Sequence, residues 1–378
     1  MMKKLFLSFL LISFFPPGSA QNKLPARQET LNTLVKVNDF YLQNHPDPLK
    51  EIPYYSRKKT YEANIWTRAV YFEGLMALYD IYPDNRYYDY AHKWGEGFKW
   101  GMRKDDTTTR NADNYACSQT YIDLYRLTPE PEMLTKTKAN MNMLVNTPQI
   151  DDWTWIDAIQ MGMPVLAKMS ALTGDQKYNE KAWRMYEWTR DSLAGGLFNQ
   201  KEGLWWRDKD FVPPYKEPNG KNCYWSRGNG WVVAALVRVL QELPENDPHR
   251  DFYIKDLKAM LDAAVKCQRE DGFWNVSLHD ESNFGGKETS GTALFVYGLA
   301  WGINNGILDR EKYMPALTKA WNAIVNDAIH PNGYIGYVQG TGKEPKDGQP
   351  VAYDSKPDFD DYGTGCVLLA GSEVYKLQ

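Results

Sequence analysis

The chain has 378 residues and a formal net charge of −4, with 43% hydrophobic and 24% charged residues. These proportions are ordinary for a folded protein with a large core and exclude disorder throughout. The acidic balance argues against a nucleic-acid-binding protein, which needs a basic surface to neutralise phosphates. The aromatic content of 14% is unusual. Because Trp and Tyr combine an apolar face with a polar edge, this composition suits carbohydrate binding, although a large helical core also uses aromatic residues.

The amino terminus (residues 1–20) has the composition of a secretory signal peptide. Two lysines precede an apolar run (residues 5–15), and small residues (18–20) form a cleavage site. The run is too short to span a bilayer, which takes about 20 residues. No cysteine follows the cleavage site, so a lipid anchor is not indicated. We expect export and a mature chain (residues 21–378) that forms a single catalytic domain. The absence of a binding module or anchor favours the periplasm over the extracellular medium.

Cysteine and histidine usage indicates neither a metal site nor a redox site. The four cysteines lie far apart and form no CxxC motif. Disulfides are possible after export, but the sequence does not pair them, and buried free thiols fit equally well. The five histidines show no HxH or HExxH spacing. We therefore expect no metal ion and no cofactor.

Helical periodicity dominates the chain, and an apolar helix followed by a polar one recurs along it. Five such pairs are predicted, at residues 66–79 and 87–100, 114–127 and 133–145, 156–172 and 178–193, 229–243 and 251–267, and 288–301 and 313–328. A first helix (28–42) and a last helix (363–375) remain unpaired. Their pairing would close a ring of six hairpins, so we predict an all-α (α/α)6 barrel rather than an open solenoid. The apolar helices would form its inner wall, and the loops before them its mouth.

Two loops that precede apolar helices carry candidate catalytic carboxylates. Asp157 follows Trp155 and Ile156 and leads into an apolar helix. Burial there should raise the pKa of its carboxyl group, as a general acid requires. Asp113 precedes another apolar helix. Aspartate is also a favoured helix N-cap, so a purely structural use of either residue stays open.

Aromatic and basic residues are grouped in two further loops. Trp225 and Trp231 flank Arg227. An arginine fork matches a carboxylate with two hydrogen bonds, and tryptophan faces stack on sugar rings, so this group suits a uronic acid. A structural arginine bound to main-chain carbonyls is the competing interpretation. Arg207 ends an aromatic turn that is expected to form a β-hairpin near the mouth (residues 203–208) or an exposed structural hairpin.

Five segments resemble the unsaturated rhamnogalacturonyl hydrolases of glycoside hydrolase family 105 and the related unsaturated glucuronyl hydrolases of family 88. The resemblance extends over essentially the whole mature chain. The segments are NADNYACSQTYIDLY (111–125), WTWIDAIQMGMPVLAKMSALTGD (153–175), GLWWRD (203–208), CYWSRGNGW (223–231) and ETSGTALFVYGLAWGINNGILD (288–309).

The resemblance implies an (α/α)6 barrel that removes a 4,5-unsaturated uronic acid from the non-reducing end of lyase-generated oligosaccharides. Such enzymes hydrate the C4=C5 double bond of the vinyl ether. By this resemblance Asp157 is the general acid and base, and Asp113 is the second acidic residue of the site. Trp225, Arg227 and Trp231 match the family's substrate-binding segment. No metal ion is required.

One position departs from the expected pattern. Arg207 stands where a histidine is expected in the family's hairpin motif. Arginine stays protonated, so it would bind a substrate carboxylate rather than act as a neutral donor and acceptor. The aglycone and the preferred uronic acid therefore stay open. Trp66, before the first inner helix, is expected to add a stacking wall.

Three other functions remain compatible with the same ring. An inverting glycosidase would use the two aspartates as a pair about 6.5–9.5 Å apart. A polysaccharide lyase would create unsaturation and would more often use Tyr or His as the base. A non-catalytic sugar-binding protein would tolerate Asp157→Asn. The expected partner is an unsaturated uronic-acid oligosaccharide, with neither nucleic acid nor, after signal cleavage, a membrane. Oligomeric state cannot be inferred.

Overall fold

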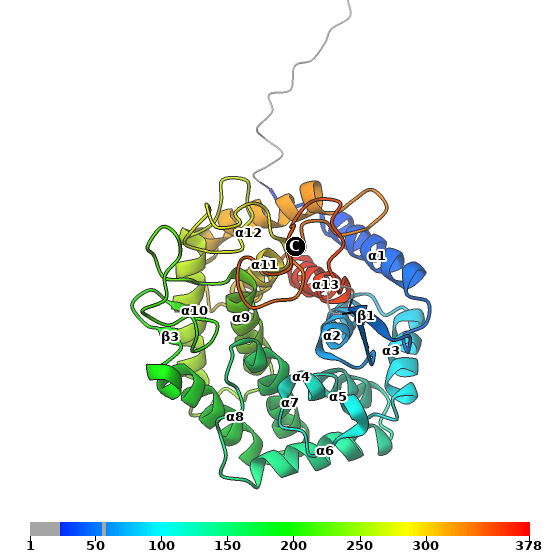
Figure 1. The fold of residues 1–378 in the computed structure, drawn as a ribbon. Helices are drawn as coiled ribbons and strands as arrows, with labels where there is room; N and C mark the ends of the chain where they lie inside the picture. Colours follow the sequence, from blue (N-terminus) through cyan, green and yellow to red (C-terminus); the bar gives the residue numbers. More distant parts are fainter. Residues whose placement is uncertain (1–22, 55–57) are drawn as a thin grey trace, which may run out of the picture.

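The computed structural model of the chain describes residues 23–54 and 58–378. Its helices form two concentric rings (Figure 1). The inner ring contains α2 (Trp66–Ile81), α5 (Ser118–Leu127), α7 (Asp157–Thr173), α9 (Ser226–Leu240), α11 (Thr289–Asn304) and α13 (Asp361–Lys376). The outer ring contains α1 (Arg27–Asn44), α3 (Asn85–Gly97), α6 (Glu132–Val145), α8 (Lys177–Glu187), α10 (Arg250–Lys266) and α12 (Arg310–Ala323). The predicted all-α (α/α)6 barrel is confirmed.

The burial of each helix explains which ring it joins. Every residue of α9 is buried, and so is every residue of α11 from Thr289 to Ile303. Helices that are apolar on all sides need neighbours on all sides. The outer helix α10 instead buries residues mainly three or four positions apart, which form one face: Tyr253, Asp256, Leu257, Met260, Leu261, Ala263 and Ala264.

Glycines allow the first and last inner helices to meet and close the ring. Helix α13 packs against both α2 and α11, and α1 packs against α13. A Cβ atom on Gly365 of α13 would lie 2.2 Å from the carbonyl oxygen of Val70 in α2. A Cβ atom on Gly74 would lie 2.5 Å from the carbonyl oxygen of Gly365. Larger residues at these positions would push the two helices apart. The predicted pairing of the terminal helices is therefore confirmed.

Three predicted helices differ in detail. The helix expected over residues 114–127 is broken into α4 (Ala112–Tyr115) and α5. At the break, Gln119 and Thr120 donate to carbonyls three residues earlier, which tightens the turn. Helices α8 and α12 each end in a π-helical turn, η3 (Trp188–Ser192) and η5 (Ile324–Ala328).

Within residues 23–54 and 58–378, two small antiparallel hairpins lie beside the helices. A hairpin pairs β3 (Phe198–Asn199) with β4 (Leu204–Trp205), so only its second strand falls within the predicted residues 203–208. A second hairpin, β1 (Ile52–Tyr54) with β2 (Lys59–Tyr61), was not predicted, because each strand has only three residues. Two short 3₁₀ turns complete the described elements: η2 (Arg103–Asp105) and η4 (Leu193–Gly195).

The predicted signal peptide lies outside the described residues, as does the proposed start of the mature chain. No described helix combines the length and the apolar character that crossing a membrane requires.

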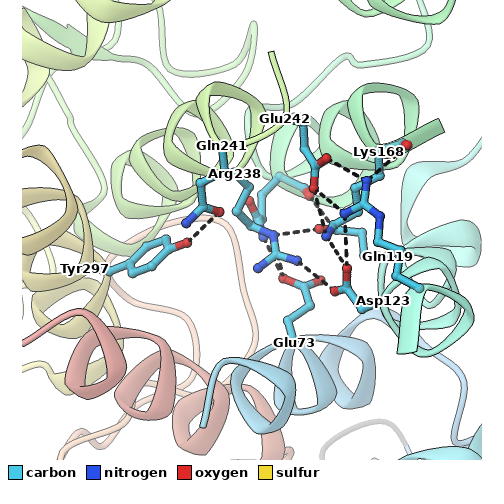
Figure 2. A network of polar contacts seen from close by, with 10 residues as sticks. Glu73, Gln119, Asp123, Lys168, Arg238, Gln241, Glu242 and Tyr297 are labelled. Carbon is cyan, nitrogen blue, oxygen red and sulfur yellow. Dashed lines mark hydrogen bonds and ion pairs between the residues drawn. The ribbon is translucent and has the colours of Figure 1, made fainter. Parts of the chain in front are cut away.

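A buried network of charged and polar groups joins the inner helices (Figure 2). Arg238 of α9 donates to Gln119 (2.8 Å) and lies 3.6 Å from Glu73 of α2. Lys168 of α7 pairs with Asp123 of α5 and with Glu242 (3.3 Å). The network thus connects four inner helices through oppositely charged side chains.

Glu73 is the most perturbed carboxyl group of this network. Its side chain is fully buried, and burial raises its pKa to about 7, although Arg238 and Lys168 oppose the rise. The folded state therefore binds the Glu73 proton more tightly than the unfolded state. Its contribution to stability is complete below the ordinary pKa of 4.5 and is lost as the pH rises through about 7.

Glu73→Gln should reduce the pH dependence of stability. Between pH 6 and pH 8 the wild-type protein should lose about 1 kcal/mol of unfolding free energy through this group, since one pKa unit corresponds to about 1.4 kcal/mol. The variant should lack this loss in urea unfolding, whereas Glu311→Gln, at an exposed position of α12, should retain it. Identical pH profiles for Glu73→Gln and wild type would contradict the assignment.

Candidate active site

A cavity of about 420 Å³ opens among the loops that precede the inner helices. Four of the predicted site residues line it: Asp113, Asp157, Arg207 and Trp66. The remaining lining residues are Tyr54, Tyr61, Ile65, Arg103, Asn111, Asn114, Trp155, Met161, Thr341, Gly342, Lys343, Asp347 and Phe359. Loops from distant parts of the chain therefore converge on the two predicted acids.

The hairpin that ends in β4 fixes the start of α7 and places a cation there. The backbone N–H of Ile156 donates to the carbonyl of Arg207 (3.0 Å), and Trp155 forms an isolated β-bridge with Asp208. Asp157 is the first residue of α7 and makes no side-chain cap, so the N-cap interpretation does not hold for it. Its carboxylate instead faces the cavity beside Arg207.

The Asp157 carboxyl group combines burial with one close cation. Its side chain is 13% exposed, and its Oδ2 lies 3.3 Å from Nε of Arg207. Neither of these two atoms has a hydrogen-bond partner among the described residues. Burial raises the pKa of Asp157, while Arg207 and Arg227 act in the opposite direction without cancelling the rise. A carboxyl group in this state can hold a proton for transfer.

Asp113 forms the second acidic group of the cavity. Asn111 caps α4, because its side chain accepts the backbone N–H of Asp113 (2.9 Å). Asp113 is therefore not the cap. Burial, followed by the nearby Asp157 carboxylate, raises the pKa of Asp113 to about 7, against the opposing charges of Arg207 and Arg103. The negative charge of Asp157 thus favours the protonated form of Asp113.

A salt bridge ties together the two loops that carry these acids. Arg110, just before α4, donates to Asp152, just before α7, through Nε (2.6 Å) and Nη2 (2.5 Å). The Asp152 side chain is almost fully buried. Such a two-point contact has a defined geometry, so it fixes the separation of the loops.

Aromatic rings form one wall of the cavity, with Trp66 at its surface. Trp231 lies behind Trp66 in an edge-to-face contact, with ring centroids 6.2 Å apart. Tyr362 packs on the same indole at 5.5 Å. The expected stacking role of Trp66 is compatible with this position. Trp231 is fully buried and supports Trp66 from beneath.

Arg227 is buried beneath the cavity, where it anchors a loop. Its Nη1 donates to the carbonyl of Gln339 (2.7 Å) and its Nη2 to that of Gly340 (2.8 Å). The guanidinium lies over the rings of Trp225 (4.6 Å) and Tyr362 (5.0 Å). These contacts fix the start of the segment 339–347, which we call the wall loop.

The same loop is held by two further contacts. The indole N–H of Trp225 donates to the side chain of Gln339 (2.9 Å), and the hydroxyl of Tyr362 donates to its carbonyl. The Gln339 side chain in turn donates to the carbonyl of Asp347 (2.7 Å). Trp225, Arg227 and Trp231 are not among the residues that line the cavity. Their contacts support its wall from behind, as the competing interpretation of a structural arginine expects, and a contact of these residues with the sugar stays a prediction.

Several lining residues were not predicted. Arg103 of η2 lies 4.8 Å over the ring of Tyr61, and its Nη1 is 3.4 Å from the side chain of Asn114. Lys343 reaches the cavity from the wall loop and pairs with Asp210 (3.1 Å). These residues lie in segments without helical periodicity, so the sequence offers no pattern from which to place them.

Among residues 23–54 and 58–378, no group of three or more His, Cys, Asp or Glu side chains is arranged to hold a metal ion. The four cysteines are free thiols in this structure.

Comparisons with known proteins identify the family. The family model of Glycosyl Hydrolase Family 88 matches residues 35–378. The chain belongs to this family. An unsaturated 3S-rhamnoglycuronyl hydrolase of Formosa agariphila is 32% identical over 333 residues, which cover 83% of this chain and 85% of that protein. The predicted kinship with families 88 and 105 is therefore confirmed.

Two solved structures are similar over nearly the whole chain. A glycosyl hydrolase family 88 protein from Bacteroides vulgatus has a TM-score of 0.85 and 33% identity, with 94% of this chain and all of that chain covered (100%). A protein described as a polysaccharide lyase has a TM-score of 0.84 and 34% identity, with 93% and 98% covered. The barrel is thus shared with proteins named for two different reactions.

Arg227→Met should loosen the wall loop. The substitution leaves two buried carbonyls without a charged donor, so we expect a loss of about 2–4 kcal/mol in unfolding free energy. Trypsin should then cleave faster after Lys343 or Lys346 of the native protein. Arg250→Met is a matched control, because Arg250 also donates to two carbonyls, those of Leu240 and Leu243, outside the cavity. Equal cleavage of the loop in both variants would contradict the anchoring role.

Proposed function

We propose that this protein hydrolyses lyase-generated oligosaccharides and releases the 4,5-unsaturated uronic acid at their non-reducing end. Family membership and the rhamnoglycuronyl hydrolase of Formosa agariphila support the reaction class. The single observation that carries the proposal is the Asp157 carboxyl group, which is buried, raised in pKa and 3.3 Å from Arg207 in a cavity with a second acid. Oligosaccharides that contain rhamnose are the first substrates to test.

In the proposed mechanism Asp157 donates its proton to C4 of the vinyl ether. The C4=C5 electrons form the new C–H bond, and positive charge develops at C5 and the ring oxygen. Asp157 then removes a proton from water as the water oxygen bonds to C5. The resulting hemiketal opens to a C5 ketone as the bond between C5 and the ring oxygen breaks. The hemiacetal left at C1 expels the aglycone as an alcohol and becomes an aldehyde.

The remaining cavity residues suit this reaction. Arg207 supplies a fixed positive charge for the carboxylate attached to C5. Asp113 would accept a hydrogen bond from a sugar hydroxyl or from the attacking water. Trp66 offers an apolar face to the sugar ring. No step of this mechanism uses a cofactor.

Asp157→Asn should lower kcat by about 10²–10⁴-fold, the usual contribution of a general acid or base, and leave the fold intact. The assay follows the ultraviolet absorbance of the enol carboxylate, which disappears on hydration, with unsaturated disaccharides from rhamnogalacturonan and from glucuronides as substrates. Asp309→Asn, at the N-cap of the outer helix α12, is the matched control and should retain wild-type activity.

Two outcomes of this assay would overturn the proposal. Near-normal turnover by Asp157→Asn would remove that residue from the acid and base roles. An increase of absorbance on an intact uronic-acid polymer, with no loss on unsaturated disaccharides, would indicate a lyase, the reaction for which one structural neighbour is named.

We also propose that the protein is exported to the periplasm. The support is the sequence of residues 1–20, with its lysines, apolar run and small residues. Fractionation of cells that produce the full chain should recover a product shortened by about 20 residues in the periplasmic fraction. Recovery of the uncleaved chain from the cytosol would contradict export.

A further inference from the structure

Arg207 lies between the carboxylates of Asp208 and Asp157, of which only Asp208 accepts a hydrogen bond from it. Its Nη1 is 2.6 Å from Oδ2 of Asp208, a hydrogen-bonded ion pair. Asp208 is itself fixed, because its Oδ1 accepts the backbone N–H of Asp210 (2.9 Å) and its backbone is bridged to Trp155. One side of the guanidinium is therefore anchored in place.

The other side of the guanidinium faces Asp157 without a hydrogen bond. Nε of Arg207 and Oδ2 of Asp157 are 3.3 Å apart, yet both are buried atoms with no hydrogen-bond partner among the described residues. A buried donor left without an acceptor is unfavourable. An incoming carboxylate that accepts from Nε would remove this penalty, and Asp157 as oriented does not.

We propose that the carboxylate of the substrate takes the place of Asp157 at Arg207, and that Asp157 binds a proton from solvent in the same event. This inference rests on the proposed function and adds to it the origin of the proton that is later transferred to C4. An enzyme molecule whose Asp157 is ionised therefore binds one substrate carboxylate and takes up one proton. Asp157 returns to its protonated form in each cycle when it takes a proton from the attacking water.

The charges around Asp157 favour this exchange. Arg207 and Arg227 oppose the effect of burial on its pKa, while Asp208 adds to that effect. Asp113, whose own pKa is raised to about 7, faces the same space, and the carboxylate of the substrate adds one more negative charge there. Once Arg207 is paired with the substrate, its charge offsets that of Asp157 less, so the pKa of Asp157 rises further.

Other elements also contribute charged side chains to the cavity around Asp157. Arg103 of η2 lowers the pKa of Asp113, and the wall loop contributes Lys343 and Asp347 to the cavity. Lys343 is paired with Asp210. Arg207 is thus the cation that lies against Asp157 and is not committed to it by a hydrogen bond.

The test compares two pH profiles from the absorbance assay. The profile of kcat/KM reports the free enzyme and that of kcat the substrate complex. In the wild type, each profile should fall above a certain pH, its upper apparent pKa. This apparent pKa should be at least one unit higher in the kcat profile than in the kcat/KM profile, which corresponds to a tenfold higher proton affinity of the substrate complex. In Arg207→Gln the two values should coincide, with the kcat/KM value moved to higher pH. Arg207→Lys should restore part of the separation.

Lys343→Gln is the matched control, because it removes a cation of the same cavity that is paired with Asp210 rather than with Asp157. It should keep the separation between the two profiles. Coincident profiles in the wild type, or a separation that persists in Arg207→Gln, would overturn the proposal. Activity of Asp157→Asn would instead overturn the proposed function itself, so the two failures are distinguishable.

Proton uptake can also be measured without turnover. The saturated uronide disaccharide, which lacks the double bond, is titrated calorimetrically in two buffers with different heats of ionisation. The wild type should bind protons with the sugar, and Asp157→Asn should not. Uptake that persists in Asp157→Asn would assign the proton to another group and overturn the proposal, even where Arg207→Gln is too slow to profile.

Discussion

The backbone contact between residues 155–156 and 207–208 is the interaction on which the candidate site depends. It joins the residues after β4 to the first turn of α7. Arg207 lies on the hairpin side of this contact and Asp157 on the helix side, so the contact brings the two side chains together. Without it, Asp157 would begin a helix in an apolar setting with no partner. The inner ring, closed by Gly74 and Gly365, supplies the rigid frame against which this small contact is held.

Much of the fold follows from the periodicity of the sequence. Apolar helices with small residues alternate with polar ones, and this alternation places each helix in its ring. The same reasoning brought Asp113 and Asp157 to one end of the barrel, since each precedes an inner helix. The structure adds that neither is an N-cap: Asn111 has that role for α4, and α7 has no side-chain cap. Only geometry could decide this, because the residue types allow both uses.

The remainder of the site could not be predicted, for two physical reasons. Arg103, Tyr61 and Lys343 lie in a short 3₁₀ turn, a three-residue strand and a loop, whose positions depend on contacts with distant residues. Arg227 lies in the predicted region, and the structure shows it bound to the carbonyls of Gln339 and Gly340. An arginine among tryptophans and glycines can donate hydrogen bonds either to a ligand or to main-chain carbonyls. Which of the two it binds depends on whether a loop covers it.

The burial of Arg227 also bears on how such a barrel could acquire a new substrate. The contacts of Trp225, Arg227 and Tyr362 reach the wall loop through main-chain carbonyls and the side chain of Gln339. The side chains that line the cavity from that loop, Thr341, Lys343 and Asp347, take no part in these contacts with Trp225, Arg227 and Tyr362. The side chains that line the cavity from the wall loop can therefore change without loss of the contacts to Arg227. Substitutions of these lining residues should alter substrate selectivity, whereas substitutions of Trp225, Arg227 or Tyr362 should mainly lower stability.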